Sequence, residues 1–178
     1  SWSRNILKEF KSKGVDFGYA CTPLVLDGKV YVPAGGESCA VIALNADDGT
    51  TAWQSGSDRA SYTPCMPVCI GGTTQILSYL EIAAYGSEPN AGETLWYSLW
   101  GSGYSPHGAW PLYREPYLYR TNPFRRGCRV DRIGVSNGKF AMEPVWANQE
   151  ICADFFSSIL VGDYIYGFDV KTPQADRD

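Results

Sequence analysis

The sequence predicts an all-β chain, a segment of a β-propeller built from four-stranded antiparallel blades. Three observations predict it: the residue composition, a phrase that occurs twice, and the spacing of four tryptophans. Aromatic residues make up 14% of the 178 residues, and aromatic side chains favour strands over helices. Nineteen Gly and 11 Pro supply the turn-forming residues that many short strands require.

The repeated phrase is an apolar run followed by a glycine turn, a threonine and a tryptophan. It reads CAVIALNADDGTTAW from Cys39 to Trp53 and EIAAYGSEPNAGETLW from Glu81 to Trp96. Ahead of each copy stands a second shared phrase, GYACTPLVLDGKVYV or SYTPCMPVCIGGTTQIL, which predicts two strands joined by a glycine turn. Each complete unit therefore holds four short strands.

The tryptophans at positions 2, 53, 96 and 146 are separated by 51, 43 and 50 residues. A unit of roughly 40 to 50 residues with four strands is typical of a propeller blade. We therefore expect blades at residues 18–53, 61–96 and 107–146, and a partial blade at 153–178. We expect Trp2, Trp53, Trp96 and Trp146 to be structural, each filling the wedge between neighbouring blades.

Short local signals agree with this organisation. The pairs Asp27-Gly28, Asn137-Gly138 and Gly162-Asp163 predict hairpin turns whose central residues need positive φ. Only the stretch from Arg4 to Lys11 carries the apolar stripe of a helix.

The number of blades raises the question of closure. Closed propellers have about four to eight blades, and three complete ones are predicted here. The chain is then either part of a longer protein, whose remaining blades cover its open edges, or a subunit whose edge strands a protein partner covers. We expect the first.

Charge, hydropathy and cysteine content exclude some classes of function. The net charge of −4 lacks the basic excess of a nucleic-acid-binding protein, and no apolar run is long enough for a membrane span. The six cysteines, with a single histidine, favour an oxidising compartment. No apolar signal core appears at the N-terminus.

The phrases VIALNADDGTTAW and GETLW, led by GYACTPLVLDGKVYV, resemble the pyrroloquinoline-quinone-like (quinoprotein-like) β-propeller repeat. Blades of that family typically carry Ala-x-Asp-x-x-Thr-Gly-x-x-x-Trp. The resemblance implies an eight-bladed propeller, of which this chain would form a bit under half, in a periplasmic or extracellular protein. Some members of the family are dehydrogenases that use the quinone and calcium, and others are scaffolds without a cofactor.

Departures from the family pattern favour the scaffold class. The alcohol-oxidising members tend to have two adjacent cysteines beside the quinone, and no cysteines are adjacent here. No Cys-x-x-Cys-His haem motif occurs either. We therefore expect a non-catalytic module that binds a protein or ligand and needs no cofactor. The rival is a dehydrogenase that uses pyrroloquinoline quinone and calcium to oxidise an alcohol or sugar.

Candidate ligand-binding residues lie near the loops that join second and third strands and near the crossovers between blades. In NPFRRGCR, the side chains of Arg125 and Arg126 are suited to a carboxylate or phosphate, with Phe124 beside them; a solvated basic turn is the alternative. His107, Trp110 and Tyr62 stand near the starts of inner strands, where they either line a funnel or pack between blades.

Metal binding has only scattered candidates. Glu37 and Asp154 are oxygen donors of the kind that calcium prefers, but they belong to different units. Cys65 and Cys69 are four residues apart, which on an extended strand separates them by about 13 Å, too far to share a zinc ion. We expect these cysteines to be buried or paired elsewhere.

Overall fold

The computed structural model describes residues 1–104 and 107–170, and it is all-β, as the sequence predicts. The described residues form one short helix and fourteen strands, and every paired strand is antiparallel to its neighbour. In each sheet the strands follow one another in chain order.

The first sheet holds β1 (Leu24–Leu26), β2 (Lys29–Pro33), β3 (Val41–Asn45) and β4 (Thr51–Ser55). The second holds β5 (Met66–Ile70), β6 (Thr73–Tyr79), β7 (Ala83–Ser87) and β8 (Thr94–Leu99). The third holds β9 (Leu112–Arg114), β10 (Tyr117–Asn122), β11 (Gly127–Ser136) and β12 (Lys139–Asn148), and a pair is formed by β13 (Ile159–Val161) and β14 (Tyr164–Tyr166).

The sheets lie slightly later in the chain than the predicted units. Each first strand begins five or six residues after the predicted start, because the residues that open each unit form part of the connection to the sheet. Each four-stranded sheet continues for two or three residues beyond its tryptophan. Residues 171–178, the end of the predicted partial blade, lie outside the described residues.

The predicted helix and hairpin turns are present. Helix α1 (Ile6–Glu9) is capped by Asn5, whose side chain accepts a hydrogen bond from the backbone N–H of Lys8. The described part of the chain has no apolar helix of membrane-crossing length. Both central residues of the Asp27-Gly28 and Asn137-Gly138 turns have positive φ, as this type of hairpin turn requires. The Gly162-Asp163 turn also joins two strands, but only Gly162 has positive φ there, so the prediction for Asp163 is wrong.

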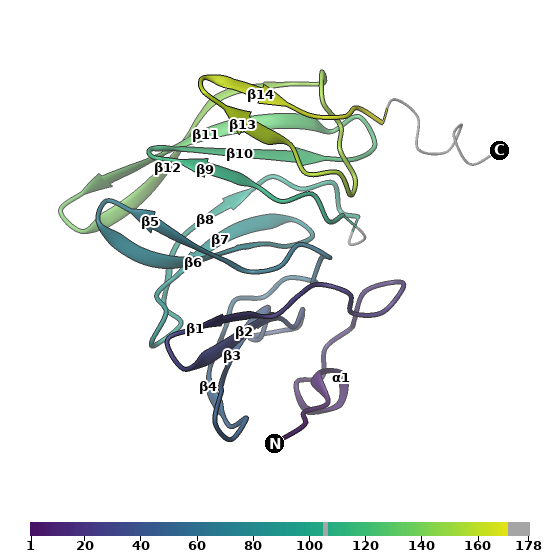
Figure 1. Cartoon of the computed structure of the whole chain (residues 1–178), viewed down its shortest axis with the longest axis vertical. Helices are drawn as coiled ribbons and strands as arrows, with labels where there is room; N and C mark the ends of the chain where they lie inside the picture. Colours follow the sequence, from purple (N-terminus) through teal and green to yellow (C-terminus); the bar gives the residue numbers. More distant parts are fainter. Residues whose placement is uncertain (105–106, 171–178) are drawn as a thin grey trace.

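The sheets are stacked one on another in chain order, from β1–β4 next to the N-terminus to β13–β14 at the opposite end (Figure 1). Apolar clusters fill the spaces between successive sheets. Trp53 of the first sheet packs in one cluster with Ile76 of the second, and Trp96 of the second packs in another with Leu118 of the third. The core is therefore a series of layers between sheets, as expected where no sheet buries both faces alone.

The same β-bulge precedes the tryptophan in all three four-stranded sheets. The register between third and fourth strands shifts just before Trp53, Trp96 and Trp146, which pair with Ala43, Gly86 and Val130. A bulge adds one residue to a strand and turns the following side chain. The repeat in sequence is therefore also a repeat in backbone geometry, and it includes the third unit, where the sequence match is loose.

Two of the four tryptophans dock on a glycine turn in the same way. Trp2 donates its indole N–H to the carbonyl of Ala46 (2.8 Å), and a Cβ atom at Gly49 would lie 2.5 Å from its ring. Trp53 donates to the carbonyl of Pro89 (2.8 Å), and a Cβ atom at Gly92 would again lie 2.5 Å from the ring. In both cases the acceptor stands three residues before the glycine, in the turn between third and fourth strands.

The third sheet breaks this pattern. Strands β11 and β12 have ten residues each, and their hairpin projects beyond the other turns (Figure 1). The position of a Cβ at Gly138, in the turn between them, has no neighbour within 4 Å. Trp96 instead donates its indole N–H to the side chain of Gln75 (2.7 Å) and is 5% exposed.

The meander places two kinds of connection at opposite ends of the strands. The hairpin end carries the turns between first and second and between third and fourth strands. The crossover end carries the remaining connections. We define the crossover end by residues 34–40, 56–65, 80–82, 100–104, 107–111, 123–126 and 149–158, together with residues 10–20 before β1 and 167–170 after β14. It holds every ligand-binding candidate that the sequence suggests.

Candidate functional site

A strip of exposed aromatic side chains runs along the crossover end. Phe17, before β1, is 79% exposed and donates its backbone N–H to the hydroxyl of Tyr62 (2.9 Å), which lies between β4 and β5. The ring of Tyr62 lies 6.2 Å from that of Phe155, between β12 and β13, which is 53% exposed. Three segments far apart in sequence are thus joined through the half-buried Tyr62, and two of them carry exposed phenylalanines.

The strip continues beyond Phe155 to further aromatic residues. Phe156 is exposed, and its ring lies 5.7 Å from that of Phe168. Trp110 is also exposed, and its backbone N–H is held by the hydroxyl of Ser157 (3.0 Å). We call the six residues Phe17, Tyr62, Trp110, Phe155, Phe156 and Phe168 the aromatic strip. Contiguous exposed apolar surface commonly marks an interaction site.

Backbone hydrogen bonds between crossovers hold the strip in place. Tyr62 donates its N–H to the carbonyl of His107 (2.9 Å), and Gly108 and Ala109 donate to the carbonyl of Asp154 (2.8 and 3.1 Å). Because three crossovers are joined in this way, the aromatic rings stand on a fixed frame rather than on independent loops.

A strained turn presents two arginines at the same end. Phe124 and Arg125 both have positive φ (55° and 57°), and the N–H of Arg126 bonds to the carbonyl of Pro123 (3.1 Å). This is the hairpin turn that normally takes Asn-Gly, and each non-glycine residue in that conformation costs about 1–2 kcal/mol. Strain of this kind is often found at functional sites.

The surroundings of this turn leave its charges available. The ring of Phe124 stands edge-on to that of Tyr104 (4.5 Å), and Gln149 donates to the carbonyl of Arg125 (2.7 Å). The guanidinium of Arg126 lies 5.8 Å from the ring centre of Trp100. Among the described residues, neither arginine forms a salt bridge with an acidic side chain.

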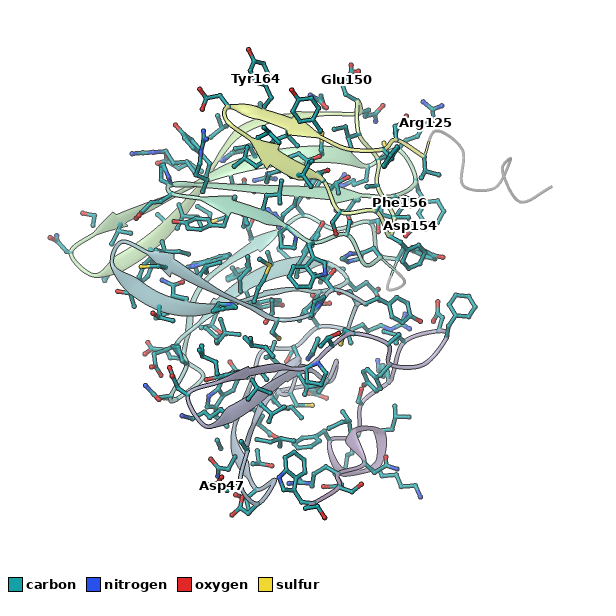
Figure 2. All side chains as sticks on the ribbon, viewed as in Figure 1. Asp47, Arg125, Glu150, Asp154, Phe156 and Tyr164 are labelled. Atoms are coloured by element: carbon teal, nitrogen blue, oxygen red, sulfur yellow. The ribbon has the colours of Figure 1, made fainter. Side chains whose placement is uncertain are left out.

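Figure 2 shows Arg125, Asp154 and Phe156 together at one side of the molecule, far from Asp47.

A fully buried ion pair anchors the strand that leads into the turn. Arg120 of β10 pairs with Asp131 of β11, donates to the side chain of Ser98 in the second sheet (2.7 Å), and lies 5.5 Å from the ring centre of Trp100. Asp131 also accepts from Arg129 (2.7 Å). Breaking a buried pair leaves an uncompensated charge, at a cost of about 3–5 kcal/mol. The pair therefore fixes β10 against the second sheet and so the position of the turn.

His107 lies beneath the surface of the crossover end. Its ring is fully buried, 4.7 Å from the ring of Tyr79, and its Nε2 bonds to the carbonyl of Leu80 (3.0 Å). Burial lowers the pKa of His107 to about 4, so the ring is neutral at pH 7 and Nε2–H is the donor. Its observed contacts tie the second crossover to the second sheet.

A charged cleft of about 270 Å³ lies at the crossover end of the first sheet, and its Lys13 and Arg59 are close in sequence to Phe17 and Tyr62 of the aromatic strip. It is lined by Lys13, Gly35, Gly36, Glu37, Ser57, Asp58 and Arg59. Arg59 bridges Asp16 (3.1 Å) and Glu81 (3.2 Å). Burial raises the pKa of Asp58 to about 6, although N–H groups of Ile82 and Ala83 bond to its carboxylate.

The candidate calcium donors belong to connections of different sheets. Glu37 lies after β2 of the first sheet, whereas Asp154 lies between β12 and β13. No group of three or more His, Cys, Asp or Glu side chains suited to a metal ion occurs among residues 1–104 and 107–170. The acidic side chains of this part of the chain therefore do not fit a calcium site that they would build alone.

The cysteines are unpaired. All six lie within the described residues, and each is free. Cys65 is buried next to Ser78, with 3.3 Å between Sγ and Oγ, whereas Cys69 of β5 is exposed. The burial expected of Cys65 is therefore observed, and Cys69 faces solvent instead.

Sequence reasoning missed the larger part of the strip and the buried ion pair. Phe155 and Phe156 form an aromatic doublet in the polar context ADFFSS, which was a usable signal for exposed aromatic residues in a crossover. No local signal marks Phe17 or the pairing of Arg120 with Asp131, because both depend on contacts across the sheet stack.

Comparison with known proteins adds no identification. No family model matches the chain, and no curated protein matches it. The quinoprotein-like resemblance therefore stays a prediction that rests on the repeated phrases.

Proposed function

We propose that the chain is part of a β-propeller that acts as a non-catalytic binding module, a scaffold for a protein or ligand in a larger extracytoplasmic protein. The stacked four-stranded meanders, the recurring bulge and the two tryptophan docks support the propeller architecture. The extracytoplasmic location is supported by the family resemblance alone.

The observation that supports the binding function is the aromatic strip together with the strained turn at residues 123–126, which presents Arg125. Exposed aromatic rings from separate crossovers offer stacking surface, and Arg125 offers a charge that no acidic side chain in the described residues neutralises. Such a surface is suited to a ligand or peptide that carries a flat ring and a carboxylate. The strained turn is consistent with selection for this presentation rather than for stability.

A titration with phenylacetate, followed by NMR of the ¹⁵N-labelled chain, tests the proposal. We expect shifts of the backbone resonances of Tyr62, Phe155 and Arg125, and weaker binding by the Phe155→Ser/Phe156→Ser variant. Each aromatic contact is worth about 0.5–1.5 kcal/mol, which corresponds to a loss of about 2-fold to 10-fold in affinity. The matched control is Tyr97→Ser, an exposed tyrosine of β8 outside the strip. Shifts spread evenly over the surface, or equal binding by the double variant, would contradict the proposal.

A second titration, with pyrroloquinoline quinone, separates the module from the dehydrogenase. Pyrroloquinoline quinone is added with and without calcium, and its absorption spectrum is recorded. Calcium-dependent binding with a changed spectrum at micromolar concentrations would favour the dehydrogenase. Binding that does not depend on calcium, or no binding, is the result expected of the module.

A further inference from the structure

A second surface, away from the crossover end, is the open face of the third sheet. A groove of about 240 Å³ runs between this sheet and the β13–β14 pair. It is lined mainly by apolar side chains, namely Leu112, Tyr117, Tyr119, Val130, Val145, Trp146, Leu160 and Ile165, with Arg114 and Asp163 at one side. The salt bridge between Arg114 and Asp163 (2.8 Å) ties β9 to the turn of the β13–β14 pair.

The groove exists because the pair covers only part of the third sheet. Within the described residues, β14 pairs with β13 alone, so its other edge carries no strand. In the first two sheets a third strand occupies the corresponding edge of the second strand. Trp146 and Val145 on β12 consequently stay 41% and 50% exposed, whereas Trp53 is 7% exposed.

Trp146 has the backbone geometry of Trp53. Each follows a bulged residue, Val145 or Ala52, and each pairs with the third strand of its sheet, at Val130 or Ala43. Trp53 uses this geometry to dock on the turn that joins β7 and β8, through the carbonyl of Pro89 and the bare Cα of Gly92. Trp146 has no such turn among the described residues.

We infer that the groove is a docking site for a β-hairpin of the same repeat type. The incoming hairpin pairs along the free edge of β14, fills the groove with its apolar face, and places on Trp146 a turn whose acceptor carbonyl stands three residues before a glycine. Its strands are about as short as β3 and β4, because the longer β11–β12 hairpin does not bring Gly138 onto a tryptophan. The inference rests on the repeat architecture of the proposed function, but it does not use the crossover end.

The chain itself supplies the probe and its matched control. The probe is a peptide of residues 83–99, the β7–β8 hairpin that seats Trp53, closed by a terminal disulfide because isolated hairpins are only marginally stable. The control peptide, residues 127–148, is the β11–β12 hairpin, whose turn docks on no tryptophan. Each is added to the ¹⁵N-labelled full chain, and the six indole N–H resonances are followed after assignment with Trp146→Phe.

We expect the resonance of Trp146 to move with the 83–99 peptide and to stay in place with the 127–148 peptide. The Val145→Asp variant is expected to bind the first peptide at least 10-fold more weakly, whereas Val25→Asp, an exposed valine of β1, leaves binding unchanged. These readouts are separate from the phenylacetate titration, so either proposal can fail alone.

Two results would overturn the inference. One is a Trp146 resonance that does not respond to the 83–99 peptide at about 1 mM, the weak end of specific binding. The other is a Trp146 resonance that moves with the concentration of the chain alone, which would mean that a second copy of the chain covers the groove.

Discussion

Gly49 and Gly92 set how closely successive layers approach. Both have positive φ, and each lies against the ring of an earlier tryptophan, Trp2 of the N-terminal segment or Trp53 of the first sheet. A side chain at either position would meet the ring at 2.5 Å, far inside van der Waals contact. The phrase Gly-x-Thr-x-Trp therefore contributes to two successive interfaces: its glycine receives the ring of an earlier tryptophan, and its own tryptophan packs against the next sheet.

The Gly92→Ala variant tests this contact at the scale of one methyl group. We expect a loss of about 2–4 kcal/mol in the free energy of unfolding, from backbone strain at positive φ and from the clash with Trp53. Urea unfolding gives the value. The control is Gly72→Ala, which has the same positive φ but open space around its Cβ position, and which should lose only the strain of about 1–2 kcal/mol. Equal losses in the two variants would show that the ring contact is unimportant.

His107 makes stability depend on pH. Its pKa in the folded chain is about 4, below the ordinary value of 6.5, so between these values the unfolded chain binds a proton that the folded chain does not. Stability therefore rises as the pH goes from about 4 to 6.5 and is lost as the pH falls through that window. The difference in free energy is at most about 3 kcal/mol.

The His107→Gln variant isolates this contribution, because glutamine does not titrate. We expect the stability advantage of the natural chain over the variant to shrink by about 1–3 kcal/mol between pH 7 and pH 4, measured by urea unfolding. Asp58, whose pKa burial raises to about 6, acts in the opposite direction but is present in both proteins. A difference between the two proteins that stays constant over this range would contradict a buried, neutral His107.

At the scale of elements, the third sheet shows how one long hairpin changes an interface. The ten-residue strands β11 and β12 carry their turn past the position where Trp96 would meet it. Trp96 packs instead against Leu118 and Ile133, and Val135 of the long hairpin lies against Gly71 of the second sheet. The two sheets are thus held by apolar packing and by the hydrogen bonds of Arg120 to Ser98 rather than by a turn dock.

The turn between β10 and β11 trades stability for the display of its side chains. Replacing Phe124 by Asn and Arg125 by Gly gives the pair that this turn prefers, so we expect the double variant to be about 1–2 kcal/mol more stable in urea unfolding. It should also bind phenylacetate more weakly, because the charge at position 125 is gone. The Arg125→Gln variant separates the two effects, since it should lose binding without gaining stability. A double variant that is no more stable than the natural chain would show that the turn is not strained.

At the scale of the whole molecule, the repeat could be predicted from sequence and the site only in part. The phrases around Trp53 and Trp96 are local, so the two strands, the turn and the tryptophan of each copy follow from residues within one unit. The place of Phe124 and Arg125 could be predicted from strand order. The loop that joins the second and third strands of a four-stranded meander lies at the same end of the sheet as the crossovers. Phe17 and Phe155 could not be linked in advance, because Tyr62 joins them only once the sheets are stacked.

The docking of Trp2 and Trp53 on successive layers is the central structural claim, since the crossover end and the open groove both depend on it. The most direct test is a nuclear Overhauser experiment on the labelled chain. We predict contacts of the Trp53 ring protons with the α-protons of Gly92, and of the Trp2 ring protons with those of Gly49. If both pairs of contacts are absent while the cross-strand contacts within each sheet are present, the sheets fold but do not stack in this way, and the account is wrong.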